Sequence, residues 1–182
     1  MNKSILTAVL VAASLATSMS AHAQVFTTSA IKSLSVYESP NGGCESVILD
    51  EIRSARQRIL VQAYSFTSPP IYKALAAAKA RGVDVRILVD KEARSTDFKG
   101  AGARYEIDHG VQIAVDEIAG KGVAHSKVMI IDAGTVITGS YNFSRLAETT
   151  NVENLLIFRD SPEVVRGYTK LWEKRAALAQ PY

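Results

Sequence analysis

Short apolar runs with strand character recur along the chain. Each is four to eight residues long, is rich in branched residues and is bounded by turn-forming residues, as is typical of strands. The runs at residues 124–131 and 135–140 are joined by Asp132-Ala133-Gly134, which is a hairpin signal. The strands that this pattern predicts cover residues 34–37, 58–64, 83–90, 111–115, 124–131, 135–140 and 152–158.

Helical spacing separates these strands. Residues 44–57 carry apolar side chains at three- and four-residue intervals, and residues 97–108 form a weaker, more polar helix. Ser68-Pro69-Pro70 and Ser161-Pro162-Glu163 are each typical of a helix N-terminus. This alternation predicts an α/β fold with a mixed, mainly parallel sheet, flanked by helices on both faces, and a late antiparallel hairpin.

Residues 1–23 have the pattern of a cleavable signal peptide. A short apolar run at residues 5–16 precedes Ser20-Ala21-His22-Ala23, which fits a small-x-small cleavage site. The run is shorter than the roughly 20 residues that span a bilayer, although an uncleaved anchor is the alternative. We expect export to the periplasm or the medium, and a single mature domain of residues 24–182.

Charge and cysteine content narrow the function only slightly. The leader contains one lysine and no acid, so the mature chain would carry 20 basic and 18 acidic residues. This balance permits a polyanionic substrate without indicating one. Cys44 is the only cysteine, which excludes an intrachain disulfide and leaves that thiol either buried or free to cross-link two chains.

Four polar residues near the hairpin indicate phosphate chemistry. His125 and Lys127 share one face of a predicted strand, and Ser140 and Asn142 follow the paired strand. Such a hairpin brings a nucleophile or base, a fixed cation and neutral donors to one place, a set that stabilises the charge developing on a phosphoryl group. Asp132 falls on the opposite face, where we expect it to fix the turn by bonding local backbone amides.

The spacing His-x-Lys-x4-Asp-x6-Gly-Ser-x-Asn, which begins at His125, resembles the signature of the phospholipase D superfamily at every defined position. The whole mature chain resembles the small bacterial endonuclease branch known as Nuc, which has one motif per chain. The resemblance implies the phospholipase D fold, a two-step reaction through a phosphohistidine and no metal requirement. It also makes Asp132 a catalytic candidate, and it implies that Glu153, 28 residues after His125, orients the histidine.

The residues themselves support part of this implication. The sequence places no carboxylate cluster around His125, and Lys127 would repel a metal ion, so we expect neither metal nor cofactor. Displacement through a histidine needs one imidazole as nucleophile and a second as acid. Since His22 leaves with the leader, we expect a homodimer that brings two copies of His125 to one phosphate. His109 is the rival acid, although its setting resembles a helix C-terminus.

Other residues are weaker candidates for the site. Lys121 and Arg145 flank the motif and are candidate substrate contacts, with a solvated surface role as the alternative. Gln62, Tyr64 and Ser65 end a strand, where they either border the cleft or pack. We expect a sequence-nonspecific endonuclease acting on DNA, with RNA as a further substrate to test. The alternatives are a phospholipase D-type lipid phosphodiesterase and an inactive nucleic-acid-binding module on the same fold.

Overall fold

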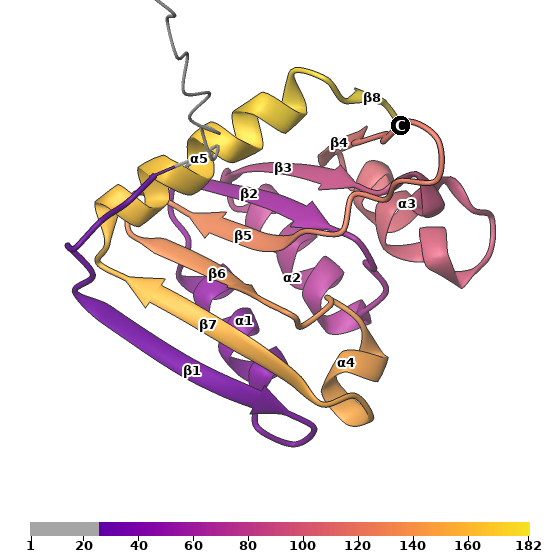
Figure 1. Cartoon of the computed structure of the whole chain (residues 1–182). Helices are drawn as coiled ribbons and strands as arrows, with labels where there is room; N and C mark the ends of the chain where they lie inside the picture. The colour runs from indigo at the N-terminus through magenta and orange to yellow at the C-terminus, as the bar shows by residue number, and fades with distance from the viewer. Residues whose placement is uncertain (1–25) are drawn as a thin grey trace, which may run out of the picture.

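The computed structural model describes residues 26–182, so the predicted signal peptide at residues 1–23 lies outside the described residues. The described chain forms one eight-stranded sheet in the order β1-β7-β6-β5-β2-β3-β4-β8 (Figure 1). The strands are β1 (Ser33–Ser39), β2 (Arg58–Ala63), β3 (Asp84–Val89), β4 (Gln112–Val115), β5 (Lys127–Ile131), β6 (Thr135–Gly139), β7 (Glu153–Arg159) and β8 (Gln180–Pro181).

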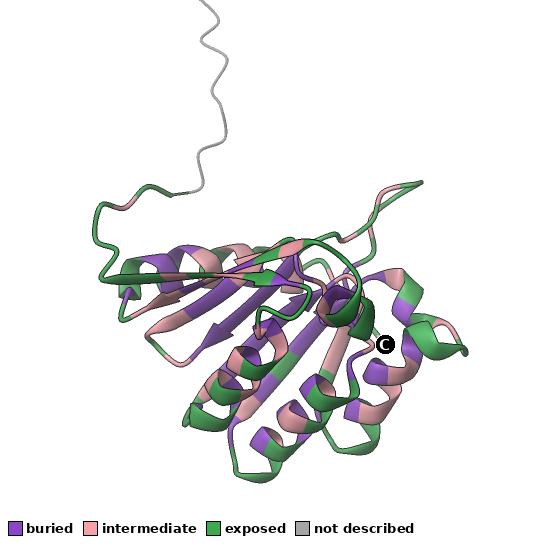
Figure 2. Ribbon diagram, turned by 90° about the horizontal axis from the view of Figure 1, so that it is seen from below, coloured by how far each residue is buried: buried purple, intermediate pink, exposed green. Residues whose placement is uncertain are grey.

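Helices cover both faces of this sheet, as the sequence predicts (Figure 1, Figure 2). One face carries α1 (Cys44–Ser54), α2 (Pro69–Ala80) and α3 (Ala101–Asp108), and the other carries α5 (Pro162–Ala176). The short helix α4 (Arg145–Thr149) and two 3-10 turns, η1 (Lys91–Arg94) and η2 (Phe98–Gly100), complete the helical elements.

The two-residue period of the central strands divides the core between the two faces. On β5, Met129 packs with the α1 and α2 side chains, whereas Val128 and Ile130 pack under α5. Trp172 of α5 joins that second cluster, and its indole N–H donates to the Val61 carbonyl at 3.0 Å. Cys44 is wholly buried at the start of α1, where burial raises the pKa of its thiol to about 11.

The α/β class is confirmed, but the expectation of a mainly parallel sheet is wrong. Among the described residues only β2–β3 and β3–β4 pair in parallel, and the other five strand pairings are antiparallel. The parallel pairs come from the two β-α-β units that alternation predicts, β2-α2-β3 and β3-α3-β4. The alternation of strands and helices does not predict that β1 lies at the edge of the sheet and pairs with β7. It also does not predict that β7 continues the β5–β6 hairpin as a third antiparallel strand.

The two Ser-Pro signals mark helix starts correctly: α2 begins at Pro69 and α5 at Pro162, although the Ser161 side chain makes no capping hydrogen bond. The Ser68 hydroxyl accepts from the Ile71 N–H at the start of α2, as the Ser-Pro-Pro sequence predicts. The predicted helix 97–108 begins instead with the 3-10 turn η2, and α3 starts at Ala101. Within residues 26–182, no helix has the length and hydropathy needed to cross a membrane.

Candidate active site

His125 lies just ahead of β5 and Lys127 is the first residue of that strand, so the predicted strand 124–131 is shorter than expected. The Tyr64 N–H donates to the Ser126 carbonyl at 3.1 Å, which extends the pairing of β2 with β5 to this point. The His125 side chain is exposed, whereas Lys127 is only 6% exposed. A nearly buried ammonium thus lies beneath an accessible imidazole.

The end of β6 brings the second half of the motif to the same place. Gly139 has a φ of 144°, and a Cβ there would lie 2.3 Å from the Asn154 carbonyl oxygen, so only glycine fits. Ser140 is bound to β7 twice, because its N–H donates to the Asn154 carbonyl and its hydroxyl accepts from the Asn154 N–H. This close approach of two strands fixes the chain that leads to Asn142.

These segments enclose an open pocket of about 340 Å³, which we call the His125 pocket. Its lining contains five of the eight side chains that the sequence predicts for the site, and the lining residues are His125, Lys127, Gly139, Ser140, Asn142 and Glu153. The convergence of the two halves of the motif is therefore confirmed as geometry.

Lys127 organises the polar groups of the His125 pocket. Its Nζ donates to the His125 carbonyl at 2.6 Å and lies 3.0 Å from the His125 Nδ1. The same ammonium lies 5.0 Å from the centre of the Tyr64 ring, and that ring contacts the His125 ring at 4.5 Å. Burial lowers the pKa of Lys127, while the nearby Glu153 carboxylate acts in the opposite direction.

Two further pocket residues have hydrogen-bonding capacity to spare. The Asn142 amide oxygen is buried and has no hydrogen-bond partner among the described residues, which is costly for an amide unless a ligand or water meets it. Glu153 accepts from the Asn151 side chain at 3.0 Å. The expected bond from the His125 Nδ1 to Glu153 is replaced by the Lys127 contact, although both side chains line the same pocket.

Asp132 lies at the far end of β5, away from the His125 pocket. Its carboxylate accepts from the backbone N–H groups of Arg56, Gln57 and Arg58 at 2.8–3.0 Å. Burial works to raise the pKa of Asp132, but these bonds outweigh it and hold the pKa below its usual value. Asp132 thus bonds backbone amides, as expected, but the expectation that these are local amides of its own turn is wrong. They belong to Arg56 and Gln57, between α1 and β2, and to Arg58, the first residue of β2.

The structure does not bring the other candidates into the His125 pocket. Lys121 is exposed on the loop before His125, and Arg145 opens α4 and lines a separate pocket with Glu45 and Glu148. His109 ends α3, where its Nδ1 lies 2.7 Å from the Tyr105 carbonyl. The helix-terminal setting expected for His109 is confirmed.

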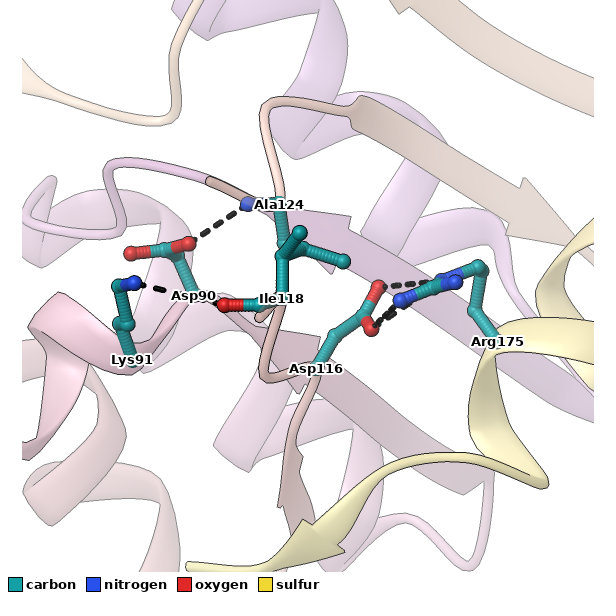
Figure 3. A network of polar contacts seen from close by, with 6 residues as sticks. All are labelled: Asp90, Lys91, Asp116, Ile118, Ala124 and Arg175. Atoms are coloured by element: carbon teal, nitrogen blue, oxygen red, sulfur yellow. Dashed lines mark hydrogen bonds and ion pairs between the residues drawn. The ribbon is translucent and has the colours of Figure 1, made fainter. Parts of the chain in front are cut away.

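Sequence reasoning missed the groups that position His125. The buried Asp90 carboxylate accepts from the Ala124 N–H at 2.6 Å, one residue before the histidine (Figure 3). Lys91 donates to the carbonyls of Ile118 and Gly120 in the same loop, and Asp116 pairs with Arg175 where the loop begins. The sequence offered only one indication of this role for Asp90, namely an acidic residue directly after an apolar strand. The contact itself could not be predicted, because Ala124 is 34 residues further along the chain.

Within residues 26–182, no group of three or more His, Cys, Asp or Glu side chains is arranged to hold a metal ion. The charged neighbour nearest to His125 is instead the Lys127 ammonium.

Comparison with known proteins identifies the family. Residues 48–175 match the family model described as "Cardiolipin synthase, PLD-like domain". The chain belongs to the phospholipase D superfamily. Nuc from Salmonella typhimurium, a phospholipase D family member of known structure, is 37% identical with a TM-score of 0.75, and the match covers 82% of this chain and 97% of Nuc. The single motif and this match confirm the resemblance to the Nuc branch.

Curated relatives in the superfamily have names that refer to lipids. A protein named "Phospholipase D" from Rickettsia bellii is 36% identical over 140 residues, which is 76% of this chain and 67% of the relative. The mouse "Mitochondrial cardiolipin hydrolase" is 29% identical over 132 residues, or 71% of this chain and 58% of that protein. Phosphodiester hydrolysis is common to these superfamily members, and this chain is a phosphodiesterase of that superfamily.

Proposed function

We propose that this protein is a metal-independent, sequence-nonspecific endonuclease that hydrolyses DNA. The observation that carries the proposal is the His125 pocket, in which a nucleophile, a buried cation and the Asn142 side-chain amide converge. The match to Nuc over 97% of that chain supports a nuclease in particular. Access to the pocket is open, as a long polymer requires.

The first step is attack of the His125 Nε2 on the phosphorus. A bond forms between nitrogen and phosphorus, the bond to the leaving oxygen breaks, and Lys127 and Asn142 donate to the nonbridging oxygens as their charge grows. In the present contact Lys127 donates to Nδ1, which would leave the ring proton on Nε2. Attack by Nε2 needs the tautomer that carries its proton on Nδ1. After rotation of the His125 ring, the Glu153 carboxylate in the same pocket would accept that Nδ1 proton in a hydrogen bond.

The leaving oxygen needs a proton, which we assign to His125 of the partner subunit in a homodimer. In the second step water attacks phosphorus, the nitrogen–phosphorus bond breaks, and the same partner imidazole takes the proton from water. His109 lines no part of the His125 pocket, which leaves the described chain without a second histidine for this role.

An apolar face of the sheet that no segment within residues 26–182 fully covers supports the homodimer. Leu34 and Val36 of β1 pair with Phe158 and Leu156 of β7 on the face that carries α5, yet Val36 is 66% exposed. Leu156 lies three residues along β7 from Glu153, about 10 Å away, and its side chain points to the opposite face of the sheet. A second copy on the α5 side of the sheet would bury this apolar surface. Val36→Lys should yield a monomer by sedimentation, with loss of turnover.

The direct test of the endonuclease is plasmid cleavage by the purified mature protein in excess EDTA. We expect nicked and linear products at scattered positions and a steep loss of activity with salt, because phosphate contacts would supply most of the DNA binding. Plasmid that stays intact at every enzyme concentration would refute the proposal. Parallel digestion of a structureless RNA tests the extension to RNA.

The names of the curated relatives favour a lipid phosphodiesterase as the second candidate. The same pocket would release the headgroup of a phospholipid. Headgroup release from phosphatidylcholine or cardiolipin vesicles, together with intact plasmid, would support this candidate and exclude the first. An inactive binding module would show neither reaction and would behave identically after His125→Ala.

We also propose export, which rests on residues 1–23. Mass measurement of the protein recovered from the periplasm or the medium should give a chain that begins at Gln24. A full-length chain held in the membrane fraction would contradict cleavage.

A further inference from the structure

A second pocket lies near the His125 pocket and is linked to it by the ring contact between Tyr64 and His125. It has a volume of about 290 Å³ and is lined by Tyr64, Ser65, Glu92, Ala93, Phe98 and Lys99; we call it the Phe98 pocket. Tyr64 connects the two pockets, because it lines the Phe98 pocket and its ring centroid lies 4.5 Å from that of His125, which lines the other. A group bound in the Phe98 pocket would therefore lie next to the reacting phosphate.

The rim of this pocket carries an aromatic side chain with no partner ring among the described residues. Phe98 of η2 is 69% exposed, the highest exposure of the aromatic residues counted among the exposed large hydrophobic side chains. Exposure of a phenylalanine to water at the edge of an active site costs free energy that ligand stacking would recover. The ring is thus available for contact with a flat partner.

The loop that carries Phe98 is held in place by its own hydrogen bonds. The Arg104 guanidinium donates to the Asp97 carbonyl at 2.8 Å, and the Asp97 carboxylate accepts from the Lys99 N–H at 2.8 Å. A Cβ at Gly100 would lie 2.1 Å from the Ser95 carbonyl oxygen, so the turn also depends on glycine. These contacts present Phe98 on a fixed support.

The charges in the Phe98 pocket compensate each other. Lys99 pairs with Glu92 at 3.2 Å, and this pairing raises the pKa of the Lys99 ammonium. A second phosphate would need an unpaired cation, which this lining lacks. An acyl chain would cover the ion pair without replacing its water, which is costly. A nucleobase fits both features, since its face stacks and its edge both donates and accepts hydrogen bonds.

We propose that the Phe98 pocket is a subsite for the base of a nucleotide adjoining the scissile phosphate, with that base stacked on Phe98. The subsite rests on the proposed nuclease function and adds that the substrate strand is held by a base as well as by phosphates. Because every base has a flat face, such a contact is compatible with cleavage that is indifferent to sequence. It favours single-stranded or frayed DNA, in which a base is free to leave its stack.

The experiment uses small chromogenic esters that differ only by a base. The esters are the p-nitrophenyl esters of thymidine 3′- and 5′-phosphate and their counterparts without the base, and p-nitrophenolate release gives kcat/KM. Phe98→Ala should lower kcat/KM about tenfold or more for the thymidine ester whose base enters the pocket, the size expected from loss of one stacked base. The matching ester without the base should be unaffected, and Phe98→Trp should retain the preference for the base.

Leu178→Ala is the matched control, because Leu178 is 59% exposed and lines neither pocket. It should leave all four rates unchanged. Equal rates for Phe98→Ala and wild type on both thymidine esters would overturn the subsite, as would an equal loss on the esters without a base. Plasmid cleavage in EDTA is scored separately, so that failure of the nuclease is distinguishable from failure of the subsite.

Binding gives a second measurement that needs no turnover. In the His125→Ala protein, a labelled oligothymidylate should bind more tightly than an equally long chain without bases, and Phe98→Ala should remove most of that difference. If Phe98→Ala instead weakens binding to phospholipid vesicles and leaves oligothymidylate binding unchanged, the pocket takes an acyl chain and the proposal is wrong.

Discussion

The two ends of β5 carry residues of the same motif but differ in how far their polar groups are satisfied. At one end, His125 is exposed, Lys127 is buried and the Asn142 amide oxygen lacks a partner. At the other end, the Asp132 carboxylate is met by three backbone N–H groups. Unmet groups at a pocket are available to a substrate, whereas satisfied groups hold the fold together. One motif therefore contains both a reactive end and a structural end.

The largest effect should come from the reactive end. His125→Ala should reduce kcat on the chromogenic esters by about three orders of magnitude or more, because it removes the nucleophile. Since the side chain is exposed, the free energy of unfolding should change by less than about 1 kcal/mol. His109→Ala is the matched control and should retain full turnover. Comparable losses of kcat in both variants would contradict the assignment of His125 as the nucleophile and of His109 as a residue outside the active site.

The buried carboxyl group of Glu106, which has no hydrogen-bond partner within residues 26–182, provides a contrast to the well-bonded carboxylate of Asp132. Glu106 is wholly buried in α3, neither of its oxygens has a partner among the described residues, and burial raises its pKa from 4.5 to about 8. The folded state therefore binds this proton more tightly than the unfolded state. The resulting stability is fully present below about pH 4.5 and is lost as the pH rises toward 8, at up to about 1.4 kcal/mol per unit.

Glu106→Gln should remove this dependence, so that the variant gains several kcal/mol relative to wild type between pH 5 and pH 8, at about 1.4 kcal/mol per pKa unit. Urea unfolding at a series of pH values measures the difference. A wild-type stability that does not fall across this range would mean that the carboxyl group finds a partner in solution.

Asp132 should show the opposite pH dependence and a smaller effect. Its lowered pKa contributes stability that is present above its unfolded pKa of about 4 and is lost as the pH falls. Asp132→Asn keeps a side chain that tolerates the positive φ of 51°, and it should cost about 2 kcal/mol through weakened N–H bonds. Turnover per folded molecule should be unchanged at neutral pH. A large fall in kcat without loss of stability would place Asp132 in the chemistry.

Periodicity was sufficient to predict both halves of the pocket, because His125, Lys127 and Asn142 depend on one local hairpin. It failed where partners are distant in sequence. The pairing of β1 with β7 joins residues more than 110 positions apart, and β8 is a two-residue strand fixed by its contact with β4. Likewise α4 is a single five-residue helix, too short for a periodic signal. Such features are decided by tertiary contacts.

The smallest effect should come from the buried Asp90. Asp90→Asn weakens the bond to the Ala124 N–H and so loosens the residue before His125. We expect kcat on the esters without a base to fall about tenfold with little change in KM, since modest misplacement of a reacting group is costly. Asp116→Asn alters the distant end of the same loop and should have a weaker effect. Equal effects from the two variants would indicate general loosening of the loop.

The central claim is that phosphorus becomes bound to His125, and rapid quenching of the reaction tests it most directly. The mature protein is mixed with excess chromogenic ester in EDTA, stopped within the first turnover under alkaline conditions that preserve phosphohistidine, and digested for mass spectrometry. We expect a phosphorus adduct on the peptide that contains His125, and none in His125→Ala. Turnover with no adduct on that peptide, or an adduct on another residue, would contradict it.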